Sequence, residues 1–287
     1  MDNIKNIYCF GTSFTAGGGF EWESTNNHRI SLLNQYYSET TEVKKQFHYS
    51  WPGQLEKILS NIKVHNLAKQ GYGNDSIYRK CFDVVNQKSF NVEESILLIE
   101  FSDFGRKEFY LNDIKDYIVC NYSHSESDIQ VHSIANSYYY DTPSIYKKLD
   151  NVFPIISNFM EKTFDENEEF KKMSMEISFF LNWLVVKNIK TIFVSSPNIF
   201  HENDKELINK FQSINYDIFG ERCYEIFSFI NKGFSIKDET NGGFDDFHAG
   251  YQTNKFISKL IYNKLIELKL INGSEYDMID EYKNLKK

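Results

Sequence analysis

The clearest candidate for chemistry is a serine near the start of the chain. Ser13 lies in the run Phe10-Gly11-Thr12-Ser13-Phe14-Thr15, directly after an apolar segment that predicts a buried strand. On the turn after such a strand, the serine hydroxyl is exposed at the edge of the sheet. If a helix follows, its first backbone N–H groups can stabilise an oxyanion. Ser13 is therefore a candidate nucleophile, although the run can equally be an ordinary turn or a helix cap.

An acid and an imidazole stand together near the other end of the chain. Asp245 and His248 are three residues apart, just before the last apolar periodic segment. In a helix or a turn they lie on one face. A carboxylate there can orient the imidazole and stabilise its cation while the imidazole takes a proton from a serine. The alternative interpretation is an acidic helix cap beside an incidental histidine.

Two further segments follow predicted strands and could complete a site. The first runs from Asn66 through Gly71 to Asn74, and its glycines allow the backbone to approach a ligand closely, although a simple strand-to-helix turn has the same composition. The second spans residues 100–106 and is polar where the sheet should end. Asn74, Asp103 and Arg106 are therefore candidate substrate-binding residues.

The elements that must position these residues alternate along the chain. Short apolar runs predict buried strands at residues 4–10, 95–101 and 190–195, and residues 63–67 predict a further short strand. Apolar spacing and capping residues predict helices that begin at Ser50 and Asn74 and two more over about 161–186 and 252–270. Alternating strands and helices predict a parallel sheet covered on both faces, which binds ligands at the carboxyl ends of its strands.

Two stretches interrupt the alternation. We expect one domain over residues 1–272, with insertions at about 25–47 and 106–160, followed by a charged tail at 273–287. Both insertions follow strands at their carboxyl ends, so they could cover a site there.

The order of these segments resembles the four sequence blocks of the SGNH/GDSL hydrolases. The run that contains Ser13 resembles the first block, Gly-Asp-Ser-x-(Ser/Thr), and Asn66 with Gly71 resembles the second. The pair Asp245 and His248 resembles the last block. The resemblance implies a flavodoxin-like three-layer α/β/α sandwich with a mostly parallel central sheet. It also implies Ser13 as nucleophile, His248 as base, Asp245 as its orienting acid, and the backbone N–H groups of Ser13 and Gly71 as oxyanion donors.

Two departures from the family pattern affect the expected site. Thr12 stands where the family has Asp, so the local support of the turn must differ. The third block, Gly-x-Asn-Asp, is replaced by residues 100–103, and Ser102 stands where the family's Asn amide donates to the oxyanion. Loss of one such donor costs about 10²–10³ in kcat, so Ser102, Arg106 or Asn74 substitutes for it or the enzyme is slow. The looser third block resembles that of divergent members found in phage genomes.

Composition narrows the classes of partner. The 287 residues carry a net charge of −8 with no basic stripe, so nucleic acid is not expected as a partner. No metal-binding motif occurs, and no metal or cofactor is predicted. The four cysteines are widely separated, which is typical of a reducing compartment. Neither a signal peptide nor a membrane-spanning run is visible, so we expect a cytoplasmic protein or one released without a signal peptide.

Two functional hypotheses follow. The first is a serine esterase or deacetylase that hydrolyses a carboxylic ester through an acyl-enzyme, with O-acetyl groups on a carbohydrate as one candidate substrate. Aromatic residues make up 16% of the chain, and their rings could stack on sugars, although a compositional bias explains the same excess. The alternative is a weakly active or inactive binding or structural module on the same fold. The acyl group and the oligomeric state stay open.

Overall fold

Among the described residues, the central sheet has five parallel strands. The computed structural model describes residues 4–17, 47–48, 50–69, 72–102, 105–113, 116–122, 129–134, 152–195, 212–215 and 251–279. Within them the strand order is β2-β1-β3-β7-β8, and every pairing in this sheet is parallel. The strands are β1 (Asn6–Phe10), β2 (Lys63–Asn66), β3 (Ser95–Ile99), β7 (Lys190–Ser195) and β8 (Gln212–Asn215). Numbered in chain order within this sheet, that order is 2-1-3-4-5, the flavodoxin-like arrangement.

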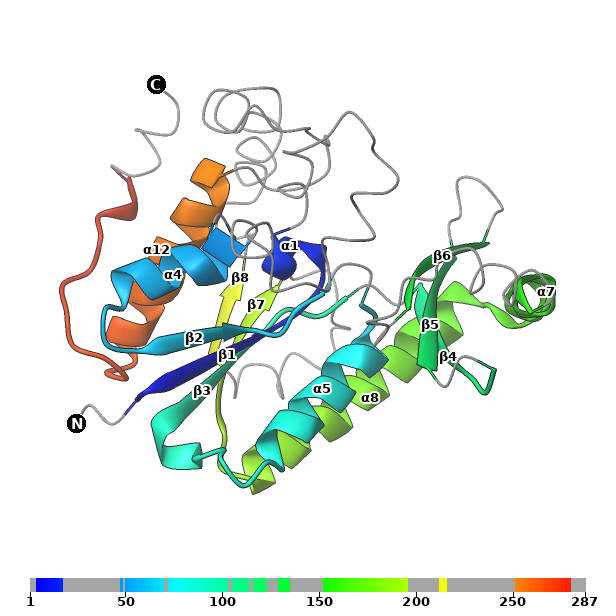
Figure 1. Ribbon diagram of the computed structural model, residues 1–287, viewed down its shortest axis with the longest axis horizontal. Helices are drawn as coiled ribbons and strands as arrows, with labels where there is room; N and C mark the ends of the chain where they lie inside the picture. The colour runs from blue at the N-terminus through cyan, green and yellow to red at the C-terminus, as the bar shows by residue number, and fades with distance from the viewer. Residues whose placement is uncertain are drawn as a thin grey trace.

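Helices cover both faces of this sheet (Figure 1). Successive residues of β3 point to opposite faces, so Leu97 and Ile99 enter one core cluster while Ile96 and Leu98 enter the other. The first cluster also contains apolar residues of α5 (Asn74–Val85) and α8 (Glu166–Val186). The second contains residues of α4 (Trp51–Ile58) and α12 (Tyr251–Glu267). The predicted three-layer α/β/α sandwich is therefore confirmed.

The helices α4 and α12 begin side by side. Ser50 caps α4, as predicted, because its Oγ accepts a hydrogen bond from the Gly53 N–H at 3.4 Å. The Trp51 N–H, which has no partner inside α4, donates to Asn254 Oδ1 at 2.8 Å. Since α4 leads into β2, its first turn lies toward the carboxyl ends of the strands. The chain therefore enters α12 near that edge.

The second expected insertion contains a separate antiparallel sheet. Its strands are β4 (Arg106–Leu111), β5 (Asp116–Tyr122) and β6 (Ile129–Ile134), in the order β4-β5-β6. The expected insertion at 25–47 lies almost entirely outside the described residues.

The helix expected over 161–186 is two helices. The chain forms α7 (Phe153–Thr163), leaves the helical conformation at Phe164, and starts α8 at Glu166. Asp165 accepts a hydrogen bond from the Glu168 N–H at 3.0 Å. This cap satisfies one of the first backbone donors of α8, so the prediction of one continuous helix was wrong at its start.

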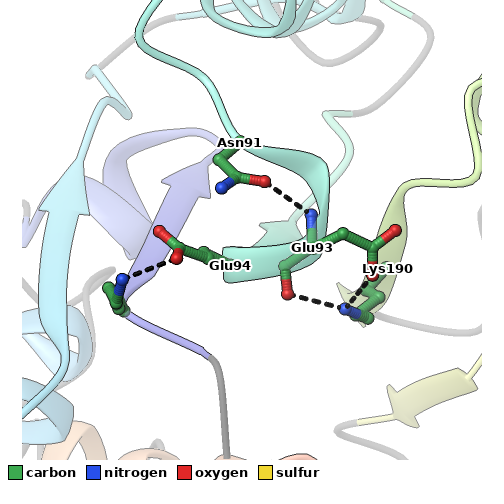
Figure 2. A network of polar contacts seen from close by, with 5 residues as sticks. Asn91, Glu93, Glu94 and Lys190 are labelled. Carbon is green, nitrogen blue, oxygen red and sulfur yellow. Dashed lines mark hydrogen bonds and ion pairs between the residues drawn. The ribbon is translucent and has the colours of Figure 1, made fainter.

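A polar network holds the amino ends of the strands (Figure 2). Lys5 Nζ lies 2.5 Å from Glu94 Oε1, which joins the segment before β1 to the short helical turn before β3. Lys190, the first residue of β7, donates to the Glu93 carbonyl at 2.9 Å. In the same turn, Asn91 Oδ1 accepts from the Glu93 N–H at 3.1 Å. This network lies at the end of the sheet opposite to Ser13.

The three cysteines among the described residues form no disulfide. Cys9, Cys81 and Cys120 are buried free thiols, and burial raises the pKa of each. No described helix is long and apolar enough to cross a membrane. Nor do the described residues contain a group of three or more His, Cys, Asp or Glu side chains that could hold a metal ion.

Candidate functional site

The segment that carries Ser13 is a tight turn at the carboxyl end of β1. After Phe10 the chain passes through Gly11 and Thr12 into α1 (Ser13–Ala16), and the Ala16 N–H donates to the Thr12 carbonyl at 2.9 Å. A Cβ on Gly11 would lie 2.6 Å from Thr15 Oγ1 and 2.7 Å from Glu100 Oε2. Only glycine lets the backbone and these side chains approach so closely. Ser13 is therefore the first residue of a short helical turn held tightly against β3.

A buried carboxylate from the end of β3 supports this turn. Glu100 Oε1 accepts a hydrogen bond from Thr12 Oγ1 at 2.7 Å. Its Oε2 accepts from the Thr15 N–H at 3.0 Å and also from the Thr15 hydroxyl. The Glu100 N–H donates to the Phe10 carbonyl at 2.9 Å, which continues the pairing of β1 with β3. Glu100 thus fixes the residue before Ser13 and the residue two positions after it.

Two effects shift the pKa of the Glu100 carboxyl in opposite directions. Burial disfavours the charged form and raises the pKa of the Glu100 carboxyl, whereas the hydrogen bonds from Thr15 and Thr12 lower it. Burial has the larger effect, so the pKa lies above its ordinary value. A buried carboxyl of this kind is stable only because donors surround it.

The strand on the other side of β1 also supports the turn. Asn66, the last residue of β2, donates from Nδ2 to the Thr15 carbonyl at 2.9 Å. Its Oδ1 accepts from the Ala68 N–H at 3.2 Å. Beyond β2, the Lys69 N–H donates to the Gly11 carbonyl at 3.3 Å. The Ser13 turn is therefore connected to both neighbouring strands.

Asn74 and Ser102 form a reciprocal contact at the same edge of the sheet. Asn74 Nδ2 donates to the Ser102 carbonyl at 3.0 Å, and the Ser102 N–H donates to Asn74 Oδ1 at 2.8 Å. Both atoms of the Asn74 amide are therefore used inside the protein, and its assignment to substrate binding stays a prediction. Ser102 is 2% exposed, and its hydroxyl has no hydrogen-bond partner within the described residues. An unpaired buried hydroxyl is costly unless a ligand or water engages it.

Arg106 anchors the inserted sheet beside this edge. Its Nη1 donates to the Tyr72 carbonyl at 3.1 Å. A Cβ on Gly73 would lie 3.2 Å from the Arg106 carbonyl, so the start of β4 packs closely against the residue that precedes α5. Contact between Arg106 and substrate stays a prediction.

Four of the predicted site residues are among the described residues. Ser13 begins α1 after β1, Ser102 follows β3, and Asn74, at the start of α5, is hydrogen-bonded to Ser102. Arg106 begins β4. That these residues form one site stays a prediction. Four predicted residues, Gly71, Asp103, Asp245 and His248, lie outside the described residues. The triad and the complete oxyanion hole therefore stay predictions.

The sequence interpretation missed the support given by Glu100. It treated position 100 only as a departure from the third block, and Asn66 only as part of a family motif. The available signal was a glutamate at the end of an apolar run that was expected to be buried on both faces. Charged residues are almost never fully buried unless they are paired, so Glu100 required a partner at the sheet edge.

Comparison with known proteins shows structural similarity alone. No protein-family model and no curated protein sequence matches the chain. The psychrotrophic esterase EstA from Pseudoalteromonas sp., in a structure inhibited by monoethylphosphonate, has 12% sequence identity and a TM-score of 0.45, over 93% of this chain and 99% of that one. A member of the lipolytic protein G-D-S-L family from Veillonella parvula has 10% identity and a TM-score of 0.41, over 92% and 97%. A carbohydrate esterase, whose active site displays divergent catalytic and non-catalytic binding functions, has 12% identity and a TM-score of 0.42, over 94% and 66%.

Proposed function

We propose that the chain is a divergent SGNH-type serine esterase with Ser13 as its nucleophile. The observation that supports this most directly is the turn at residues 11–16, which follows a central parallel strand and is hydrogen-bonded to Glu100 on one side and Asn66 on the other. Ligands of open parallel sheets bind at this edge. A nucleophile held on a rigid turn there loses little freedom when it attacks.

In the proposed reaction, His248 takes the proton from Ser13 Oγ as that oxygen bonds to the carbonyl carbon of the ester. Asp245 stabilises the imidazolium, which then gives the proton to the departing alcohol. A water molecule, deprotonated by His248, attacks the resulting acyl-enzyme and releases the carboxylic acid. His248 comes three residues before Tyr251, the first residue of α12. The entry of the chain into α12 near the site edge supports its assignment as the base.

Three donors are proposed for the oxyanion: the backbone N–H groups of Ser13 and Gly71 and the hydroxyl of Ser102. The case for Ser102 rests on two features. Its backbone is held by Asn74, and its buried hydroxyl has no partner within the described residues. A fixed hydroxyl with an unused proton can donate to an oxygen that becomes negatively charged.

The proposed substrate is a small carboxylic ester, with acetylated carbohydrate as the class to test first. The inserted sheet presents Tyr110, 49% exposed, in edge contact with Tyr117 at a ring distance of 5.1 Å. Such rings can stack on a sugar. Initial rates on p-nitrophenyl esters of increasing chain length, measured beside acetylated sugars, test this choice. A preference for long acyl chains would contradict it.

Covalent labelling tests the proposed function. A fluorophosphonate probe should label the wild-type protein, and peptide mass mapping should locate the adduct on Ser13. Ser13→Ala should abolish labelling, whereas Ser157→Ala on α7, where the hydroxyl donates to Glu161 Oε1 at 3.5 Å, is the matched control and should label normally. Equal labelling of Ser13→Ala would refute the assignment. Absence of labelling in a folded wild type would favour the binding-module alternative.

A further inference from the structure

We infer that Glu100 is a positioning residue for the proposed nucleophile: this carboxylate, directly after β3, binds the Thr12 hydroxyl and the Thr15 N–H on either side of Ser13. This inference rests on the proposed role of Ser13 and adds to it a residue outside the predicted triad and oxyanion hole. Glu100 touches Thr12 and Thr15 and is 6% exposed, so its carboxyl lies within the protein.

The contacts leave the turn little freedom. Thr12 Oγ1 and the Thr15 N–H approach different oxygens of the same carboxyl, at 2.7 Å and 3.0 Å. One rigid, planar group therefore fixes the residue before Ser13 and the first turn of α1. Misplacement of a reacting atom by about 1 Å can reduce a rate by about 10²-fold.

Packing alone does not account for a carboxyl at this position. The other residues at the end of β3 are apolar and fully buried, as Leu98 and Ile99 illustrate. An apolar side chain there would avoid the desolvation of a charge, which is among the larger costs in a protein interior. Groups with such perturbed environments concentrate at functional sites, and here the group contacts the turn that bears the proposed nucleophile.

The position of the Glu100 carboxyl also explains how the turn is supported although Thr12 stands where the family pattern has Asp. The family resemblance implies a carboxylate at position 12, whereas here Thr12 donates to a carboxylate from position 100. The two positions are within hydrogen-bond distance, so a carboxylate on either one can serve the same turn. A carboxylate on both would place two like charges in one buried site, which strongly disfavours the ionisation of one of them.

Moving the carboxylate from position 100 to position 12 provides the test. In Glu100→Gln, the side-chain amide keeps one acceptor oxygen, which can still accept from Thr15. The amide nitrogen then faces Thr12, so the Thr12 hydroxyl proton loses its acceptor. In the double variant Thr12→Asp/Glu100→Gln, the new carboxylate at position 12 accepts from the new amide at position 100, while the amide oxygen still accepts from Thr15. Glu94→Gln is the matched control, because it removes a carboxylate at the opposite end of β3.

The readouts are the fluorophosphonate labelling rate, the kcat and KM for an ester, and the melting temperature. Glu100→Gln should label ~10-fold to ~100-fold more slowly and should lower kcat with KM changed by less than about twofold, since Glu100 is buried beneath the turn. Glu94→Gln should match the wild type. The double variant should label at least about tenfold faster than Thr12→Asp alone and faster than Glu100→Gln.

The outcomes separate the two proposals. Failure of the folded wild type to label would overturn the proposed function. Normal labelling of the wild type together with normal labelling of folded Glu100→Gln would overturn only the role of Glu100. If Glu100→Gln does not fold, the double variant decides: a folded protein that labels supports the inference, and one that does not label overturns it.

Discussion

The side chain of Glu108 connects the inserted sheet to α5, and its burial predicts how the free energy of unfolding depends on pH. Glu108 on β4 lies 2.7 Å from Arg79 Nη1 on α5, with side-chain exposures of 2% and 28%. The Arg79 guanidinium also lies over the ring of Tyr117 on β5, at 3.9 Å from its centroid. Glu108 therefore lies at the junction between two strands of the inserted sheet and a helix of the main domain.

Burial has the largest effect on the pKa of the Glu108 carboxyl. It raises the pKa of Glu108 to about 7, and the nearby Asp75 adds to the rise, although the hydrogen bond and charge of Arg79 oppose it. An unfolded glutamate has a pKa near 4.3–4.5, so the two states differ by about 2.5 pH units, and at about 1.4 kcal/mol per unit the difference is about 3 kcal/mol. The folded state holds a proton that the unfolded state has released. The stabilisation is therefore complete below about pH 4.5 and is lost as the pH rises through about 7.

Urea unfolding of the wild type and Glu108→Gln at two pH values measures this contribution. Between about pH 5 and about pH 7.5, the free energy of unfolding should fall by about 2 kcal/mol more in the wild type than in the variant. Glu168→Gln is the control, because the Glu168 side chain is 70% exposed and forms its ion pair with Lys171 at the surface. It should follow the wild type. Identical pH dependence in the wild type and Glu108→Gln would show that this reasoning about burial is wrong.

Two further substitutions test the packing of the site edge. Gly11→Ala would place a Cβ 2.6 Å from Thr15 Oγ1 and 2.7 Å from Glu100 Oε2, so it should lower the free energy of unfolding in urea by about 1–3 kcal/mol; an unchanged midpoint would contradict this packing. Asn74→Ala leaves the buried N–H and carbonyl of Ser102 without their partner, and it should cost about 1–3 kcal/mol by calorimetry. A loss below about 0.5 kcal/mol would mean that other groups replace the amide.

The central strands were predictable, and β3 was the clearest of them. The predicted strands at 4–10, 63–67, 95–101 and 190–195 correspond to β1, β2, β3 and β7. All five residues of β3 are buried, which explains its nearly continuous apolar sequence, whereas β2 has a single buried residue, Val64. The edge strand β8 was missed, because its four residues, Gln-Ser-Ile-Asn, contain no such run.

The strands of the inserted sheet were harder to predict. They lie in a polar, tyrosine-rich stretch, and every residue of β4 keeps part of its surface exposed, although Ile118, Val119 and Cys120 of β5 are fully buried. Their pairing comes from antiparallel backbone hydrogen bonds, which a single sequence does not reveal. The break between α7 and α8 did have a local signal, since Asp165 precedes a run of helix-forming residues and caps it.

The support of the Ser13 turn could not be predicted from either of its segments alone. Thr12 and Glu100 are 88 positions apart, and only the register of the parallel sheet, in which Phe10 pairs with Ile99, brings their side chains together. Gly11 has the same explanation, because the space that a Cβ would occupy is filled by Glu100 and Thr15. The glycine of the first segment and the glutamate of the third therefore depend on each other. The double variant Thr12→Asp/Glu100→Gln tests whether a carboxylate on the first segment can replace the one that follows β3.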